Sequence, residues 1–229
     1  MRFSFILLAG GDGNRFKSKI PKQYHEIAGK TLVDISVDKI RTFKEVKKIV
    51  LVYNKEHKKY LKKINLKNIS LIIGGKTRDE STLKALSYLK KQNVRGKVLI
   101  HDAARPNFSK KLIKDIIINS HLNKVVVPIL KIQDALKEKR NKNKILNIER
   151  NNFFLTQTPQ SFNLNEIFHL HKKKKLEYKD DDLSLIDTSL GIKFINGEKK
   201  NFKITDIDDF ELLKNFNKSN QKIGIGFDV

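Results

Sequence analysis

The 229-residue sequence contains no cysteine and no tryptophan. Without cysteine there is no disulfide bond and no thiolate metal site, a composition typical of proteins in the reducing cytoplasm. No apolar run approaches the roughly 18 residues of a membrane-spanning helix. The first residues lead straight into a strand-like run and show no signal-peptide cleavage site. We therefore expect a cytoplasmic protein without a membrane segment.

Acidic residues are also in short supply. The chain has 25 Asp and Glu against 48 Lys and Arg, which gives a formal net charge of +23. Such a charge is typical of nucleic-acid-binding proteins. However, forty of the 48 basic residues are lysines spread over the whole chain, and aromatic residues do not alternate with them as in single-strand binders. We interpret the charge as a compositional bias of a solvated surface and do not expect a nucleic-acid partner.

Apolar runs alternate with helical patterns along the first 130 residues. The runs predict buried strands at Phe3–Leu8, Ile49–Tyr53, Ile69–Ile73, Val98–Ile100 and Val125–Val127. The segments between them predict helices from a Thr31 cap to Phe43, at Glu56–Lys63, at Glu80–Lys91 and from a Ser109 cap to Asn119. This alternation indicates an α/β sandwich with a mostly parallel twisted sheet. Ligands of such sheets bind beyond the carboxyl ends of the strands.

Residues 131–154 interrupt the alternation. Their charged middle, Lys137–Lys144, resembles a hairpin tip between two extended legs. No apolar face in this region is large enough for a core of its own. We therefore predict a β-arm that projects from the domain and serves in dimerisation rather than as a free loop.

The remaining chain carries weaker signals. Asn163 and Glu166 have the spacing of a capping box and predict the start of a short helix. Opposite charge runs at Lys172–Lys175 and Asp180–Asp182 are interpreted as solvated. Later elements are expected as strands at Ile192–Ile195 and Phe202–Ile204, followed by a helix that begins at Asp206 and turns Phe210, Leu213 and Phe216 inward.

A glycine-rich loop follows the first predicted strand directly, with the sequence Ala9-Gly10-Gly11-Asp12-Gly13-Asn14-Arg15-Phe16. Glycines let backbone N–H groups approach phosphate oxygens, and the cations of this stretch can neutralise the phosphate charge. The loop is not a Walker A motif, and Phe16 stands where a dinucleotide-binding loop has its third glycine. We therefore favour a nucleoside triphosphate as ligand, although an ordinary tight turn remains an alternative.

Two further stretches point to phosphoryl chemistry. Pro21 stiffens the backbone before Lys22, and a held ammonium can stabilise charge on a transferring phosphoryl group. The segment from His101 to Pro106 places an acid, Asp102, at the end of a buried strand. Asp102 is the best candidate for Mg²⁺, which prefers a carboxylate together with phosphate oxygens. A helix N-cap or a surface salt bridge is the alternative role of Asp102.

Four motifs occur in one order along the chain: Ala-Gly-Gly-x-Gly-x-Arg at 9–15, Pro-Lys-Gln-Tyr at 21–24, Gly-Gly-x-x-Arg-x-x-Ser at 74–81 and His-Asp-Ala-Ala-Arg-Pro at 101–106. Together they resemble the 2-C-methyl-D-erythritol 4-phosphate cytidylyltransferase family of the non-mevalonate isoprenoid pathway. Further matches are Arg150-Asn151, Thr158-Pro159-Gln160 and Asn201–Thr205. The resemblance spans Phe3 to about Phe216.

This resemblance implies an activity, a fold and a set of partners. CMP would pass from CTP to 2-C-methyl-D-erythritol 4-phosphate with release of pyrophosphate, and Mg²⁺ would be the cofactor. The fold would be a Rossmann-like nucleotidyltransferase sandwich that forms a homodimer through the β-arm. Because the acceptor's phosphate oxygen is already a nucleophile, alignment and charge neutralisation suffice, and no histidine base is needed. His169 and His171 would point to different faces of a helix, which disfavours a metal site there.

The resemblance also implies roles for individual residues. Arg15 and Lys22 would stabilise the α-phosphate, and Asp102 would hold the metal. Arg150, from the same or the partner subunit, and Lys203 would position the acceptor phosphate, with Arg105 in the same region. The CTP pocket would be lined by Ala9, Gly10, Gly11, Gly75, Ser81 and Ala103.

The sequence departs from the family pattern in one place and extends beyond it in another. Asp134-Ala135 stands where the family has Asp-Thr, so one hydroxyl toward the acceptor phosphate is missing. Gly224–Val229 resembles the start of 2-C-methyl-D-erythritol 2,4-cyclodiphosphate synthase. We therefore expect a cytidylyltransferase domain at 1–217, followed at 218–229 by a linker and the first residues of a truncated second domain of a bifunctional enzyme.

Two alternative functions remain open at this point. Another polyol- or sugar-phosphate nucleotidyltransferase, such as a ribitol-phosphate cytidylyltransferase, shares the glycine loop and Pro-Lys-Gln. Ala104 and the cyclase-like tail argue against it. From a different class, a basic nucleic-acid-binding protein would use the +23 surface.

Overall fold

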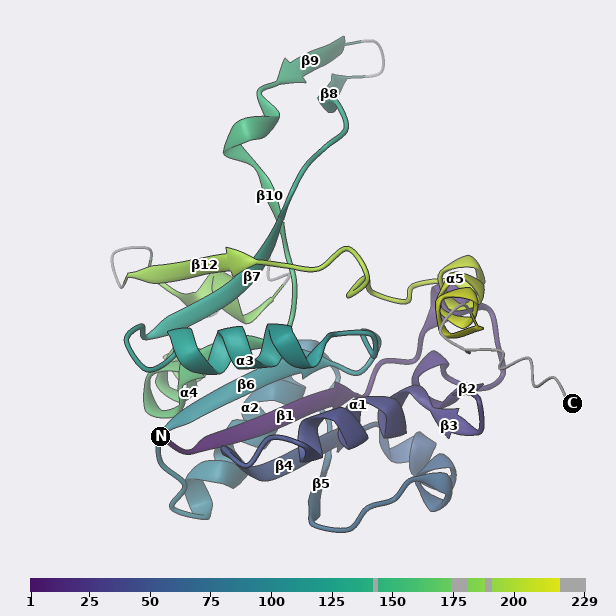
Figure 1. Ribbon diagram of the computed structural model, residues 1–229, viewed down its shortest axis with the longest axis vertical. Helices are drawn as coiled ribbons and strands as arrows, with labels where there is room; N and C mark the ends of the chain where they lie inside the picture. Colours follow the sequence, from purple (N-terminus) through teal and green to yellow (C-terminus); the bar gives the residue numbers. More distant parts are fainter. Residues whose placement is uncertain (142–143, 174–180, 188–190, 219–229) are drawn as a thin grey trace, which may run out of the picture.

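An eight-stranded, mostly parallel sheet runs through the computed structural model, which describes residues 1–141, 144–173, 181–187 and 191–218 (Figure 1). The strand order is β10-β7-β11-β6-β1-β4-β5, and β12 also pairs with β7. The parallel core consists of β1 (Phe3–Ala9), β4 (Val46–Tyr53), β5 (Ile69–Ile73) and β6 (Lys97–Asp102). The prediction of an α/β sandwich is confirmed.

The other part of the sheet is built around β7 (Val125–Lys131). The strand β11 (Gln160–Asn163) lies antiparallel between β6 and β7. Two further strands also pair with β7, namely β10 (Phe154–Thr156) in antiparallel and β12 (Ile192–Asn196) in parallel orientation. The later strands therefore extend the sheet that the first half of the chain begins.

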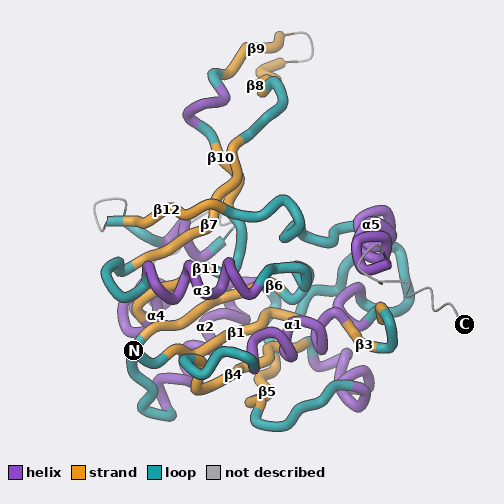
Figure 2. Tube along the Cα trace, viewed as in Figure 1, coloured by secondary structure: helices purple, strands orange, loops and turns teal. Residues whose placement is uncertain are grey.

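Helices cover both faces of the sheet (Figures 1 and 2). In β1, Phe5 and Leu7 pack in the clusters formed with α3 (Lys110–Asn119) and α1 (Leu32–Arg41). Ile6 points the other way and packs with α2 (Arg78–Lys91) and α4 (Leu164–Lys173). Because successive side chains of a strand point to opposite faces, a strand buried on both faces needs a continuous apolar run. This requirement explains why β1, β4 and β6 could be predicted.

The predicted helix starts are confirmed by their capping hydrogen bonds. Thr31 forms a capping box with Asp34 at the start of α1. The Ser109 Oγ accepts from the Leu112 N–H at 3.0 Å, and Asn163 Oδ1 accepts from the Glu166 N–H at 3.2 Å. These side chains satisfy N–H groups that have no partner within the helix.

Two later helical predictions also hold. The basic segment η3 (Lys55–Lys63) is helical, although of the 3-10 type. The last helix, α5 (Ile207–Lys218), begins just after Asp206, whose Oδ1 accepts from the Asp209 N–H at 3.1 Å. Within the described ranges, none of the helices has the length and apolar character needed to cross a lipid bilayer.

The predicted strand at Phe202–Ile204 is wrong. This segment is not part of a sheet ladder. It crosses toward the end of β6, where the Ile204 N–H donates to the Ala104 carbonyl at 2.8 Å and the Ile204 side chain is buried. The apolar pattern of the segment therefore reflects burial against a loop rather than strand pairing.

Several short strands escaped prediction. The small hairpin of β2 (Glu26–Ile27) and β3 (Lys30–Thr31) turns at Ala28 and Gly29, whose φ angles are 49° and 74°. Two consecutive positive φ values are typical of the tight turns that match hairpin twist. These strands have two residues each, too few to produce an alternating pattern.

The β-arm projects from the sheet as predicted (Figure 1). Its outer part is the hairpin of β8 (Leu136–Asn141) and β9 (Lys144–Ile148), in which Leu136 pairs with Ile148. Most of the predicted tip at Lys137–Lys144 therefore belongs to a strand, while residues 142–143 lie outside the described residues. Apolar side chains of the arm face solvent in the single chain, with exposures of 68% for Ile145, 47% for Phe153 and 40% for Phe154.

Candidate active site

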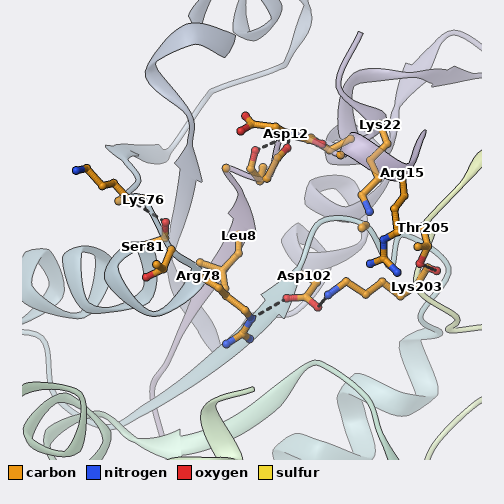
Figure 3. A pocket seen from close by; sticks show the side chains of 18 residues that line it. Leu8, Asp12, Arg15, Lys22, Lys76, Arg78, Ser81, Asp102, Lys203 and Thr205 are labelled. Atoms are coloured by element: carbon orange, nitrogen blue, oxygen red, sulfur yellow. Dashed lines mark hydrogen bonds and ion pairs between the residues drawn. The ribbon is translucent and has the colours of Figure 1, made fainter. Parts of the chain in front are cut away.

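A cleft of about 460 Å³ opens beyond the carboxyl ends of β1 and β6 (Figure 3). Four parts of the chain form its walls: the glycine loop with the segment after it, the N-terminal turn of α2, the end of β6 and the segment before α5. The lining residues are Leu8, Ala9, Gly10, Gly11, Asp12, Gly13, Arg15, Lys22, Gln23, Gly75, Lys76, Thr77, Arg78, Ser81, Asp102, Ala104, Lys203 and Thr205. This volume falls within the range of small-molecule sites, about 300–1,000 Å³.

Gln23 fixes the glycine loop. Its buried amide donates to the Ala9 carbonyl at 2.7 Å and to the Gly11 carbonyl at 2.9 Å. On the other side of the loop, the Asn54 amide donates to Asp12 Oδ1 at 2.7 Å. Gly13 has a φ of +71°, a left-handed conformation that favours glycine. The loop that was predicted to hold phosphates is therefore held in one shape by buried and neighbouring side chains.

The turn between β5 and α2 packs closely against the first residues of α2. The Gly75 N–H donates to Ser81 Oγ at 3.0 Å, and Thr77 caps the helix by accepting from the Glu80 N–H at 3.1 Å. A Cβ atom on Gly75 would lie 2.2 Å from the Glu80 Cβ, so no larger residue fits without movement. The spacing Gly-Gly-x-x-Arg-x-x-Ser thus has a structural reason. The positive end of the helix dipole favours negative charge in the cleft.

Three cations gather at one side of the cleft, namely Arg15, Lys22 and Lys203 (Figure 3). Burial lowers the pKa of Lys22, and the charges of Lys203 and Arg15 lower it further. These side chains therefore repel one another in the free protein. An anionic ligand between them would relieve that repulsion.

Asp102 is the carboxylate next to these cations. Its Oδ2 lies 2.9 Å from the Lys203 ammonium, and its Oδ1 lies 3.3 Å from Arg78 Nε. Burial by itself would raise the pKa of Asp102, but Arg78 and Lys203 outweigh burial and hold the pKa well below its ordinary value. Asp102 is thus ionised at neutral pH, in a largely buried position at the edge of the cleft.

Arg78 and Asp182 were missed by the sequence analysis. Arg78 Nη2 lies 2.7 Å from Asp182 Oδ2, and the Asp182 side chain is 0% exposed. The interpretation of Asp180–Asp182 as a solvated run is therefore wrong for Asp182, because this carboxylate is buried against a guanidinium. Asp180 and Lys174–Lys175 lie outside the described residues. Arg78 stands within a quoted motif, which was the available signal, whereas Asp182 had none.

The structure brings nine of the twelve predicted site residues to the cleft and leaves three out of its wall. Ala103 is buried in the core, and its N–H donates to the Leu8 carbonyl at 2.9 Å. Arg105 is directed toward the Asn201 carbonyl at 3.0 Å, and burial lowers its pKa. Arg150 lies in η4 (Arg150–Asn152) within the arm, exposed and bonded to the Gln133 carbonyl.

Histidines contribute no base to the cleft wall. His169 is exposed and His171 is buried, so the two do face different sides of α4. His101 is buried next to Asp102, where its Nε2 lies 3.0 Å from the Arg105 carbonyl. Burial lowers the pKa of His101 to about 3, so its ring is neutral at physiological pH.

Known proteins resemble this chain in sequence and in fold. A family model described as 2-C-methyl-D-erythritol 4-phosphate cytidylyltransferase (IspD) matches residues 3–216. The bifunctional enzyme IspD/IspF of Pelagibacter ubique is 45% identical over 229 residues, which cover 100% of this chain and 60% of that protein. The chain therefore spans less than two thirds of that bifunctional relative.

Two further comparisons cover whole proteins of similar size. The 2-C-methyl-D-erythritol 4-phosphate cytidylyltransferase of Thermosipho melanesiensis is 36% identical over 216 residues, covering 91% of this chain and 94% of that protein. The crystal structure of 4-diphosphocytidyl-2C-methyl-D-erythritol synthase from Anaerococcus prevotii aligns with a TM-score of 0.77 at 27% identity. That alignment covers 95% of this chain and 98% of the other.

Proposed function

The chain belongs to the 2-C-methyl-D-erythritol 4-phosphate cytidylyltransferase family, and on this premise we propose that it transfers CMP from CTP to 2-C-methyl-D-erythritol 4-phosphate and releases pyrophosphate. One observation carries the proposal beyond family membership. Arg15, Lys22 and Lys203 crowd one side of a cleft whose opposite walls are a glycine loop and a helix N-terminus. Such a site favours phosphorylated ligands over neutral metabolites.

The reaction needs alignment more than proton transfer. A phosphate oxygen of the acceptor attacks the α-phosphorus of CTP, and the bond from that phosphorus to the pyrophosphate oxygen breaks. Pyrophosphate leaves with the electron pair, so negative charge grows around the α-phosphate. Arg15 and Lys22 would neutralise this charge, while Gly75 and Ser81 would border the cytosine. Preorganised charges of this kind act without reorganising at the moment of reaction.

Lys203 would position the acceptor phosphate. Its ammonium lies at the cleft and is kept there by Asp102 Oδ2 at 2.9 Å. Thr205, two residues further, also lines the cleft and was not anticipated from the sequence. Arg105 donates to the Asn201 carbonyl at 3.0 Å and would thereby hold the segment that carries Lys203 in place.

Mg²⁺ would be held at Asp102. Over residues 1–141, 144–173, 181–187 and 191–218, no three His, Cys, Asp or Glu side chains gather in one group. An ion bound by one carboxylate and substrate phosphate oxygens needs no such group. The ionised Asp102 fits as its protein ligand together with CTP if Lys203, which pairs with Asp102 Oδ2 in the free protein, turns to the acceptor phosphate instead. When bound, the ion would neutralise phosphate charge.

A homodimer through the arm is the second part of the proposal. Support comes from the apolar side chains that the arm exposes in the single chain, among them Ile145, Phe153 and Phe154. Arg150 lies in this arm and would reach the acceptor phosphate in the partner subunit's cleft. Ala103 would support the CTP pocket from the core side rather than line it.

The dimer can be tested by sedimentation. Phe153→Asp should convert the dimer to a monomer and lower turnover, because the contribution of Arg150 would be lost with the partner. Leu122→Asp is the matched control, since Leu122 is 92% exposed and lies outside the arm. A monomeric wild-type protein, or a Phe153→Asp variant that stays dimeric, would contradict the arm interface.

We further propose that residues 1–217 form the cytidylyltransferase domain and that 218–229 begin a second, cyclodiphosphate synthase-like unit. Support comes from the bifunctional relative with 45% identity and from the tail sequence Gly224–Val229. Residues 219–229 lie outside the described residues. A cytoplasmic location is proposed in keeping with the absence of cysteine.

The roles of Arg15 and Lys22 can be tested by substitution. Arg15→Ala and Lys22→Ala should each lower turnover by about 100-fold or more, as expected when one group that stabilises transition-state charge is removed. Lys111→Ala is the control, because Lys111 lies on α3 with an 83% exposed side chain. Near-normal turnover of either cleft variant would contradict the assigned roles.

A further inference from the structure

A row of four side chains of alternating charge, extended inward by one histidine, leads from the cleft into the interior. The Lys203 ammonium lies 2.9 Å from Asp102 Oδ2, and Asp102 Oδ1 lies 3.3 Å from Arg78 Nε. Arg78 Nη2 lies 2.7 Å from Asp182 Oδ2, and Asp182 Oδ1 lies 2.9 Å from His171 Nε2. We call these five side chains the charged row. Its outer members line the cleft, and its inner members, Asp182 and His171, do not.

The inner end of the row is fully buried. The side chains of Asp182 and His171 are 0% and 1% exposed, whereas that of Lys203 at the outer end is 41% exposed. Arg78 outweighs burial and lowers the pKa of Asp182, so this carboxylate is ionised at neutral pH. Burying an ion pair of this kind is costly and often adds no stability over apolar packing. The cost points to a role in orientation.

Asp182 and His171 are held by elements away from the cleft. Asp181, which caps η5 (Asp182–Leu185), accepts from Thr156 Oγ1 at 2.8 Å and from the Gln160 amide at 2.6 Å. Leu185 is fully buried in the same core cluster as α2 and α4. His171 lies in the last turn of α4. The inner end of the row is therefore anchored independently of any ligand in the cleft.

The anchoring determines which atoms of Arg78 meet Asp102. The guanidinium has five N–H donors in a rigid fork that can grip both oxygens of one carboxylate. Here Nη2 forms an ion pair with Asp182 at 2.7 Å, and Nε faces a single oxygen of Asp102. The other Asp102 oxygen is thereby left to Lys203 at the cleft (Figure 3). Without Asp182, the fork of Arg78 would be able to close on both oxygens and displace Lys203.

We propose that Asp182 and His171 are positioning residues that hold Arg78 so that Asp102 keeps one oxygen turned toward Lys203 and the cleft. This rests on the proposed function, because it treats Asp102 and Lys203 as parts of the transfer site. Asp182 acts on Arg78 directly, and His171 acts by fixing the orientation of Asp182.

Three variants test the proposal kinetically. Asp182→Asn keeps the shape of the side chain and removes its charge, so kcat should fall by about 10–100-fold, the range found when outer partners of a site are removed. The KM for CTP should change far less, because the glycine loop and the turn before α2 stay in place. His171→Gln, which keeps an N–H donor, should retain most of the activity that His171→Leu loses. Asp115→Asn is the control, because Asp115 pairs with Lys111 on the solvent-facing side of α3.

A direct readout uses the Arg78 side chain itself. The sequence has only eight arginines, so the Arg78 Nε–H signal can be assigned in ¹⁵N spectra by comparison with Arg78→Lys. In the protein without substrates, Asp182→Asn should move this signal and speed its exchange with solvent, while Asp115→Asn should not. If Asp182→Asn fails to fold, the same Arg78 Nε–H signal is compared between His171→Leu and His171→Gln. The signal should move in His171→Leu and stay near its wild-type position in His171→Gln.

The outcomes separate this inference from the proposed function. An unchanged Arg78 signal together with unchanged kcat in Asp182→Asn would overturn the inference. So would a loss of kcat that only follows the loss of folded protein in thermal melting. A wild-type protein that transfers no CMP would instead refute the proposed function, and the Arg78 signal would still report whether Asp182 orients the guanidinium.

Discussion

At the mouth of the cleft, the Lys22 ammonium is partly buried near two cations, Lys203 and Arg15, whose effect on its pKa outweighs that of the carboxylates of Asp102 and Asp209. Burial and the neighbouring Lys203 and Arg15 lower its pKa below the ordinary lysine value. At neutral pH Lys22 is protonated in both states, but its proton is bound less tightly in the folded protein than in the unfolded chain. The charged Lys22 therefore lowers the free energy of unfolding. This unfavourable contribution is fully present below the folded pKa of Lys22 and fades only as pH rises toward the unfolded value.

Lys22→Met should consequently stabilise the free protein while abolishing transfer. We expect the melting temperature at pH 7 without nucleotide to rise by roughly 1–4 °C, since about 1 kcal/mol shifts a domain of this size by that order. Lys44→Met, at an exposed position between α1 and β4, should leave the melting temperature nearly unchanged. A lower melting temperature for Lys22→Met would show that repulsion from Lys203 and Arg15 does not destabilise the free protein.

Gly75 makes the tight turn before α2 possible. An added Cβ would lie 2.2 Å from the Glu80 Cβ and 3.1 Å from the Glu80 carbonyl carbon, so the backbone itself must move. Gly75→Ala should lower the free energy of unfolding by about 1–3 kcal/mol in urea, as overpacking typically does. Gly11→Ala is the matched control, because a Cβ there meets nothing within 4 Å. Equal stability of both variants would contradict this reading of the turn.

At the scale of elements, Lys39 ties α1 to the loop between β6 and α3. Its ammonium donates to the Pro106 carbonyl at 2.8 Å and to the Phe108 carbonyl at 3.2 Å. Burial lowers the pKa of Lys39 to about 8. Between that value and about 10.4, the pKa of an unperturbed lysine, the unfolded chain binds more protons than the folded protein. Stability from this group therefore rises with pH through this window and is lost as pH falls toward 8.

Urea unfolding of wild type and Lys39→Met between pH 7.5 and 10 tests this linkage. The difference in unfolding free energy should shift in favour of wild type as the pH rises. Lys111→Met, whose parent side chain is exposed on α3, should show no such trend. A difference for Lys39→Met that stays constant over the range would mean that Lys39 keeps an ordinary pKa.

The strands differ in how far their sequences reveal them. Strands β1, β4 and β6 are buried on both faces, and their continuous apolar runs predict them directly. Strand β11 has four residues, including the polar Gln160 and Ser161, and is specified by its pairing with β6 and β7. The pattern at Phe202–Ile204 was misleading for a related reason, since Ile204 is buried by a loop contact. Local sequence cannot report such long-range neighbours.

Some residues of the candidate site can likewise be predicted from local sequence, and others cannot. Arg15, Lys22, Asp102 and Lys203 stand in motifs whose chemistry is readable from residue type, and all four line the cleft. Asp182 stands in an acidic run that looks solvated by composition. Its burial follows from Arg78, which is 104 positions earlier in the sequence. Pairings of this length are set by the topology of the sheet and not by a local pattern.

At the scale of the whole molecule, the parallel sheet brings four distant segments to one edge. The loop after β1, the turn after β5, the end of β6 and the segment at Lys203–Thr205 meet there because parallel strands share their carboxyl ends. Most of the +23 charge lies elsewhere on the chain and plays no part in this convergence. The site therefore argues for phosphorylated small molecules rather than for nucleic acid.

Transfer of CMP by this protein can be followed through pyrophosphate release in the presence of CTP and Mg²⁺. With 2-C-methyl-D-erythritol 4-phosphate as acceptor, we expect one pyrophosphate for each CMP transferred, and with ribitol phosphate we expect almost none. Release with neither acceptor would contradict the assigned activity. Release with ribitol phosphate alone would leave a cytidylyltransferase with a different acceptor.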